Sequence, residues 1–439
     1  MPRIQDFFKF GERNTTAAIE IRAGITTFLM MAYVIVVNSG ILSKAGMPFA
    51  GVLFATVLVS ALSSIAMGLY ANLPYSLAPG MGINAFFTFS LVLGQGVPWQ
   101  TALGAVFLSG ILFVLLSLTG TRTTIVKAIP PALRLGLAAG IGLFLALIGL
   151  RSVGFIVASP VTLITFGPLN AIITLFVIGL VITSAMMLKR IPGALILGAI
   201  IVSFMALVVS QAGWVAKPIV TLPERIFSWP SLDVFFKLDI TGALTTGMIM
   251  PVFSLFFVDL FDSIASFVGI SQVSGLTEED GTPLEIGKAL LVDAASTTIS
   301  GLFGTSSGTV YVESAAGIEE GGRTGLTAIV TGLLFLPFMF LSPLLAFVPD
   351  VATAPVLVLV GVFMAQPLIL IDWKDMEEAI PAFLALILIP LTFSITQGVV
   401  WSFLIYTLIK LALGKAKDVH WMLYVIDGFA ILTLCQPLL

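Results

Sequence analysis

Long apolar runs recur along the whole chain, and they constrain its fold more than any other feature. Most are roughly 17 to 25 residues long, with short polar joins, and a helix needs about 20 apolar residues to cross the ~30 Å core of a bilayer. Apolar residues make up 58% of the 439 positions and charged residues 10%, against about 25% charged in soluble domains. The pattern predicts an all-α polytopic membrane protein, one membrane domain over residues 1–439, with the lipid bilayer as a partner.

We expect fourteen transmembrane segments. The tenth and the thirteenth are too short to cross as complete helices, which is typical of broken spans. The last apolar stretch, residues 421–438, contains Asp427, and the sequence leaves open whether it spans the membrane or lies at its surface. The expected spans are residues 17–41, 50–71, 77–94, 99–120, 131–151, 168–189, 192–213, 242–271, 287–303, 305–318, 324–345, 354–371, 379–393 and 396–413.

The basic residues predict an orientation. Arg3, Lys9 and Arg13 precede a first apolar run that is too long for the hydrophobic region of a signal peptide, so we expect that helix to remain in the mature protein. With a cytoplasmic N-terminus, most of the Lys and Arg residues fall in cytoplasmic loops, as the positive-inside rule requires. We therefore expect a multi-pass protein of the plasma (inner) membrane with its N-terminus in the cytoplasm. The sequence leaves the oligomeric state open, with a homodimer as one of the assemblies considered.

The composition argues against several classes of function. The one cysteine, Cys435, excludes an internal disulfide, and the one histidine, His420, lies outside the apolar runs, so we expect no metal site. No Gly-Lys-Ser/Thr sequence follows a glycine cluster, so a phosphate-binding loop for ATP is not predicted. The net charge is −3 and no basic tract suggests nucleic acid. We expect no cofactor, and we do not expect an enzyme.

The longest expected external loop, residues 214–240, divides the chain into seven spans and seven spans. An odd number in each half places the halves in opposite membrane orientations, which is an inverted repeat. The repeats are expected at about residues 17–213 and 242–413. Their third spans, residues 77–94 and 305–318, are both interrupted by Gly, Pro, Ser or Thr. Such a matched pair is the best sequence indication of a transporter's binding site.

Four carboxyl groups lie in stretches that otherwise resemble lipid-buried helix: Asp259, Asp262, Asp293 and Glu313. A charge at the centre of a membrane helix costs about 2.5 to 3.5 kcal/mol on insertion scales, so these acids indicate function. Asp259 and Asp262 share one helical face and will not both ionise easily, so one of them can carry a proton. In the alternative interpretation, each acid bonds to Ser or Thr and only holds helices together.

The first interrupted span offers groups for a planar ligand that is rich in hydrogen bonds. Gly82 allows close approach of the backbone, and the amide of Asn84 both donates and accepts. Phe86 can stack on a flat ring. The alternatives are that the glycine only lets helices pack closely and that the aromatic ring belongs to the core. Close packing is the favoured interpretation for a second set of glycines, Gly136, Gly140, Gly142 and Gly149.

Five strings of residues, taken in order, resemble the AzgA-like purine permeases, which belong to the second nucleobase-cation symporter family. The resemblance runs nearly from end to end, with two departures: Ala265-Ser266 stands where many relatives have Gly-Thr, and the tenth span has fewer Ser and Thr. Both departures bear on purine preference. The strings are Gly24–Leu29, Ala78–Phe87, Phe261–Ser263, Tyr311–Gly317 and Gly321–Ala328.

The resemblance implies a uracil-permease-like fold of two inverted repeats of seven spans. Spans 1–4 and 8–11 would form a core domain that moves against a gate domain of spans 5–7 and 12–14. It also implies proton-coupled uptake of adenine, guanine, hypoxanthine or xanthine. The residues expected to bind substrate are Gly82, Asn84, Ala85, Phe86, Asp262, Val312 and Glu313, and those expected to couple the proton or support the site are Asp259, Asp262 and Asp293.

Two rival functions follow from the same residues. The first is a transporter of the same fold that carries sulfate or another anion, although an anion site favours helix N-termini and basic side chains rather than acids. The second is an intramembrane hydrolase with paired aspartates. The spacing of Asp259 and Asp262 on one helix fits such a pair poorly.

Overall fold

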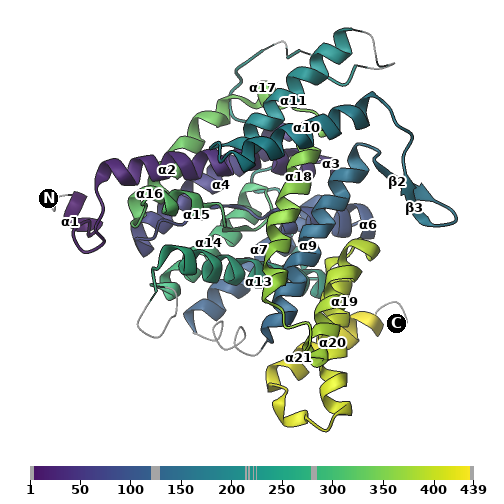
Figure 1. Cartoon of the computed structure of the whole chain (residues 1–439). Coiled ribbons are helices and arrows are strands. Elements are labelled where there is room, and N and C mark those ends of the chain that lie inside the picture. The colour runs from purple at the N-terminus through teal and green to yellow at the C-terminus, as the bar shows by residue number, and fades with distance from the viewer. Residues whose placement is uncertain are drawn as a thin grey trace.

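The computed structural model describes residues 4–119, 129–212, 225–277 and 284–435, together with positions 215, 218–220, 222 and 223. Helices dominate it (Figure 1). Among the described residues, nine helices are long and apolar enough to cross a membrane, and shorter apolar helices occupy Met81–Gln95, Thr246–Leu260 and Gly325–Phe340. Each of the fourteen expected spans contains a helix. The prediction of a polytopic helical protein is therefore confirmed.

The elements of the first half follow the expected spans within a few residues. They are α1 (Ile4–Phe7), α2 (Ala17–Met31), α3 (Tyr33–Lys44), α4 (Phe49–Ala66), η1 (Met67–Ala71), β1 (Leu77–Pro79), α5 (Met81–Ala85), η2 (Phe86–Val92), α6 (Leu93–Gln95), α7 (Trp99–Leu118), α9 (Pro131–Ser152), β2 (Ile156–Ser159), β3 (Leu163–Phe166), α10 (Ala171–Leu188) and α11 (Ala194–Gln211).

The second half begins with two short turns ahead of its first long helix. Its elements are α12 (Ile240–Ala243), η3 (Thr246–Met248), α13 (Ile249–Ser274), α14 (Ile286–Phe303), β4 (Gly308–Val310), α15 (Ser314–Glu319), α16 (Gly325–Phe335), η4 (Leu336–Phe340), α17 (Ser342–Leu345), α18 (Asp350–Ala365), η5 (Gln366–Leu370), α19 (Met376–Thr392), α20 (Ile395–Ala412), η6 (Ala416–Asp418) and α21 (Trp421–Cys435).

Local chemistry sets the helix boundaries. The side chain of Asn170 accepts a hydrogen bond from the Ile173 amide and begins α10, and the Ser394 hydroxyl does the same for α20. Such side chains satisfy amides that have no partner inside the helix. Gly304 ends α14 with φ +91°, and a Cβ there would lie 2.5 Å from Val234. Only glycine fits that position without strain.

The second set of glycines lies where helices pack closely: Gly136, Gly140, Gly142 and Gly149. A Cβ on Gly136 would lie 2.5 Å from the Ala382 carbonyl oxygen of α19, and one on Gly142 would lie 2.7 Å from Cβ of Met364 in α18. Helix α9 packs along both α18 and α19 (Figure 1). The prediction that these glycines serve helix packing is confirmed, since small residues let helix backbones approach.

Three details differ from the expected spans. An antiparallel hairpin of β2 and β3 precedes α10, with Ile156 opposite Phe166, and it projects from the bundle (Figure 1). Helix α16 ends at Phe335 because Pro337 cannot continue its hydrogen bonding, and η4 and α17 follow. The apolar stretch that the sequence left open is helical at Trp421–Cys435 and packs on α20.

Candidate functional site

The two interrupted spans meet as a short antiparallel ladder. Strands β1 and β4 pair with Ala78 opposite Thr309. The Gly80 amide donates to the Ser307 carbonyl at 2.9 Å, and the Tyr311 amide donates to the Ser76 carbonyl at 3.0 Å. We call this paired region, residues 76–80 and 307–311, the strand crossing. Each broken helix supplies the hydrogen bonds that the other has lost, as non-helical backbone at membrane depth requires.

Hydroxyl groups from neighbouring helices complete the strand crossing. The Ser64 oxygen accepts from the Leu77 amide at 3.0 Å, and its hydroxyl contacts the Leu77 carbonyl oxygen at 3.1 Å. On the other strand, the Thr297 hydroxyl lies 3.2 Å from the Gly308 carbonyl oxygen. These side chains belong to α4 and α14, so both neighbouring helices fix the strands in place.

Asp262 and Glu313 lie beside the strand crossing. Glu313 is 9% exposed, and its Oε1 accepts a hydrogen bond from the Tyr33 hydroxyl at 2.7 Å. Oδ2 of Asp262 lies 3.4 Å from the place that a Cβ on Gly80 would occupy. Asp262 is also close enough to Asp293 and Glu313 to interact with both electrostatically. The fold therefore brings together three of the four predicted acids.

The fourth acid, Asp259, faces the supporting helix α14. It is fully buried, and its Oδ2 accepts from the Thr297 hydroxyl at 2.7 Å. Since Thr297 also contacts the backbone of Gly308, this aspartate contributes to holding strand β4. Asp293 is 1% exposed and lies in α14, the helix that also carries Thr297.

The residues that follow β1 point in different directions. The buried amide of Asn84 accepts a hydrogen bond from the Ser306 hydroxyl. Gly82 contacts α9 instead, since a Cβ there would lie 2.4 Å from Cγ2 of Ile141. Ala85 and Phe86 are fully buried in the core, whereas Val312, which follows β4, is 44% exposed. Asn84 is therefore the predicted residue after β1 whose side chain bonds to the opposite interrupted span.

The structure places three more polar side chains here: Tyr311, which the second interrupted span offers to a ligand, and Tyr33 and Ser306, to which sequence reasoning gave no role. Tyr33 bonds to Glu313, the Tyr311 hydroxyl donates to the Pro79 carbonyl at 2.5 Å, and Ser306 bonds to Asn84. Tyr33 is 1% exposed and lies in the first expected span, and a buried hydroxyl needs a partner. Its place in that span was available in the sequence, but it does not say which partner is used.

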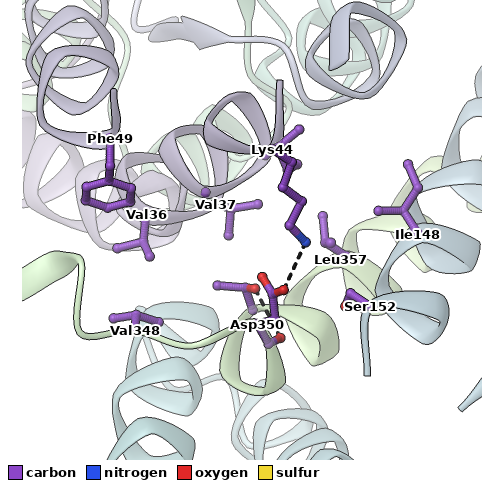
Figure 2. A pocket seen from close by; sticks show the side chains of 12 residues that line it. Val36, Val37, Lys44, Phe49, Ile148, Ser152, Val348, Asp350 and Leu357 are labelled. Carbon is purple, nitrogen blue, oxygen red and sulfur yellow. Dashed lines mark hydrogen bonds and ion pairs between the residues drawn. The ribbon is translucent and has the colours of Figure 1, made fainter. Parts of the chain in front are cut away.

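A second region lies away from the strand crossing. Residues of α3, α9 and α18 line a small cavity, and Lys44 and Asp350 form an ion pair across it, with 3.1 Å between Nζ and Oδ2 (Figure 2). Val37, Ile148 and Leu357 form apolar parts of its wall. We call it the Lys44 cavity. None of the four membrane acids lines it.

A bundle of membrane spans in which two broken helices pair with each other is the arrangement of a membrane transporter. The chain belongs to the Permease family (Xan_ur_permease), which it matches over residues 18–400. This membership, together with the relatives described next, confirms the resemblance seen in the sequence strings.

Relatives from bacteria and archaea match nearly the whole chain. A putative permease of Methanocaldococcus jannaschii is 44% identical and covers 97% of this chain and 97% of its own. The adenine permease AdeP of Escherichia coli is 39% identical over 94% of this chain and 92% of its own. The guanine/hypoxanthine permease PbuO of Bacillus subtilis is 38% identical over 98% of this chain and 99% of its own.

Solved structures confirm the fold. The transmembrane domain of the cyanobacterial bicarbonate transporter BicA superposes with a TM-score of 0.65 at 18% identity, covering 87% of this chain and 97% of that domain. The murine anion transporter Slc26a9 in its inward-facing state gives a TM-score of 0.62 at 10% identity, covering 89% and 68%. The architecture is thus two inverted repeats of seven spans. At such low identity these likenesses extend to the fold alone.

Proposed function

We propose that this protein takes up a purine nucleobase by secondary active transport, with a proton as the coupling ion. The names of its relatives support the cargo class, since they include adenine and guanine/hypoxanthine permeases. The observation that carries the proposal is the strand crossing, which holds the Glu313 carboxyl and the Asn84 amide on opposite interrupted spans. A purine ring presents N–H donors and ring-nitrogen acceptors in one plane, which carboxyl and amide groups can match.

Each residue has a proposed role. Glu313 accepts N–H groups of the base, Asn84 contacts the ring, and backbone groups of Ala85 and Val312 complete the binding site.

Asp262 carries or controls the proton, and Asp293 lies close enough to interact with it electrostatically. Asp259 supports strand β4 through Thr297. Gly82 acts by allowing close contact with α9, and Phe86 forms a buried wall beside the site.

We infer alternating access by movement of the core domain against the gate domain. The close contact between Gly82 and Ile141 of α9 lies at the boundary between the proposed domains. We also place the N-terminus in the cytoplasm and the protein in the plasma (inner) membrane. A cysteine introduced at residue 5 should then react only with reagents that cross the membrane, provided that Cys435 is first replaced by serine.

The test is uptake of labelled adenine, guanine and hypoxanthine at low concentration into cells that lack their own purine permeases, with and without a protonophore. We expect the wild type to accumulate one or two of these bases, and the protonophore to abolish accumulation. Uptake that persists with the protonophore would leave the cargo intact and overturn proton coupling. No uptake of any base by protein present in the membrane would overturn the proposal, and competition assays with bicarbonate and sulfate would follow.

A further inference from the structure

Tyr33 is placed by a break in the first span. Helix α2 ends at Met31 and α3 begins at Tyr33, with Ala32 between them. At this break the Ile35 amide bonds to the Ala32 carbonyl at 3.3 Å, a tighter turn than the α-helix uses. Tyr33 is 1% exposed, and its hydroxyl is directed to Glu313, 280 residues further along the chain.

The surroundings of this pair are acidic. Tyr311 comes from the segment after β4, Asp262 from α13 and Asp293 from α14, and these groups interact electrostatically with Tyr33, with Glu313 or with each other. An ionised Glu313 among them needs hydrogen-bond donors, and a hydroxyl that donates to a carboxylate is one of the stronger hydrogen bonds in proteins. The Tyr33 hydroxyl supplies such a donor at 2.7 Å.

A phenol hydroxyl both donates and accepts, whereas a carboxyl group changes its character when it takes a proton. Tyr33 can donate to the Glu313 carboxylate, and it can accept from the Glu313 carboxylic acid after the hydroxyl rotates. The side chain of Glu313 therefore keeps a partner in both protonation states, which a phenylalanine at position 33 would not provide.

We propose that Tyr33 is a positioning residue of the transport site: its hydroxyl keeps the Glu313 carboxyl directed toward the nucleobase through both protonation states of the cycle. This inference rests on the proposed function. Tyr33 itself touches Glu313, so its effect on transport passes through that carboxyl group. The specific consequence is that Tyr33 influences how uptake depends on pH, in addition to how tightly the base is bound.

The test compares Tyr33→Phe with Tyr406→Phe, a matched loss of one phenol hydroxyl at a residue that is 5% exposed in α20. Initial uptake of the labelled base that the wild type transports is measured from pH 5.5 to 8 at equal surface abundance. We expect Tyr33→Phe to lower Vmax/KM at least tenfold and to displace the pH profile. Tyr406→Phe should keep the wild-type profile. An unchanged profile for Tyr33→Phe, with Vmax/KM within twofold of wild type, would overturn the inference.

Two further outcomes are decisive. If Tyr33→Phe reaches the membrane poorly, the purified variant is assayed for binding of the same labelled base at pH 6 and at pH 8. A wild-type ratio of the two affinities would then count against a positioning role, and an altered ratio would support it. If the wild type transports no purine, the proposed function fails with this inference; wild-type uptake with an unaffected Tyr33→Phe variant removes this inference alone.

Discussion

The strand crossing and the Lys44 cavity both join residues that are distant in sequence, but their carboxyl groups bond to different kinds of partner. At the crossing, the hydroxyls of Tyr33 and Thr297 donate to Glu313 and Asp259, and all four residues are at most 9% exposed. In the cavity, Asp350 pairs with a lysine, and the two side chains are 53% and 31% exposed.

This difference follows from the surroundings. A buried ion pair loses the hydration of two charges, whereas a neutral hydroxyl satisfies a carboxyl group in either protonation state. An exposed ion pair keeps much of its hydration and contributes little stability, so it breaks readily. The crossing therefore holds its acids in buried hydrogen bonds to neutral hydroxyls, whereas the cavity holds an ion pair that water can reach.

The largest effect should come from Glu313→Gln. The amide has the shape of the carboxyl group but cannot ionise, so uptake of the transported base should fall at least a hundredfold at unchanged surface abundance. Labelled-base uptake measures this loss. The control is Glu320→Gln, the same change at an exposed position. Strong uptake by Glu313→Gln would show that the crossing does not need its acid.

Gly80→Ala should have the next largest effect. The added methyl group would lie 2.8 Å from Cγ2 of Thr309 and 3.4 Å from Oδ2 of Asp262. Overpacking of this kind typically costs about 1 to 3 kcal/mol, so the melting temperature of the purified protein should fall together with uptake.

The matched control for Gly80→Ala is a glycine of the Lys44 cavity. Gly40 lines the Lys44 cavity, and a Cβ there meets nothing within 4 Å. Gly40→Ala should melt at or slightly above the wild-type temperature, because alanine favours the helix over glycine by roughly 0.5 to 1 kcal/mol. Equal melting temperatures for the two alanine variants would contradict the contrast between a packed crossing and an open cavity.

Thr297→Val should be intermediate. It preserves the shape of the side chain but removes the hydroxyl that donates to Asp259 at 2.7 Å, and the loss of one buried hydrogen bond to a carboxyl group costs about 1 to 3 kcal/mol. Thermal melting in detergent measures this loss. Thr298→Val is the control, because the Thr298 hydroxyl bonds only to the Ala294 carbonyl of its own helix at 3.0 Å in the described contacts. A larger loss from Thr298→Val would argue that Asp259 does not depend on Thr297.

Lys44→Ala should have the smallest effect on stability, about 0 to 1 kcal/mol, as expected for a partly exposed ion pair. The free energy of the ion pair is measured from the melting temperatures of Lys44→Ala, Asp350→Ala and the double variant, each at low and at high salt. This free energy should shrink at high salt, because salt screens the pair. A loss as large as that of Thr297→Val would show that the cavity is as tightly closed as the crossing.

The sequence predicted most of the spans within a few residues because the bilayer demands long apolar helices, and this demand is local. It also identified the two interrupted spans as partners, since an inverted repeat fixes which spans correspond. It could not predict that these spans pair as strands, nor that Tyr33 and Thr297 donate to the acids, because each partner comes from a distant part of the chain. Gly82 was expected to offer its backbone to a ligand, and its contact with Ile141 depends on how α9 packs.

The β2–β3 hairpin was missed for a different reason. Its residues, such as Ile156 and Phe166, favour strands, but they lie between two strong helical patterns where a loop was the simpler expectation. The roles of the individual site residues and the division into core and gate domains stay predictions.

The pairing of β1 with β4 also has a consequence for biosynthesis. The Tyr311 hydroxyl and the Pro79 carbonyl that it contacts are separated by 232 residues. At about 5 to 20 residues per second of translation, β1 emerges roughly 10 to 50 s before its partner exists. During that interval the polar backbone of the third span lacks its ladder. Until β4 is made, the backbone groups of β1 need other hydrogen-bond partners, because polar backbone at membrane depth cannot stay unpaired.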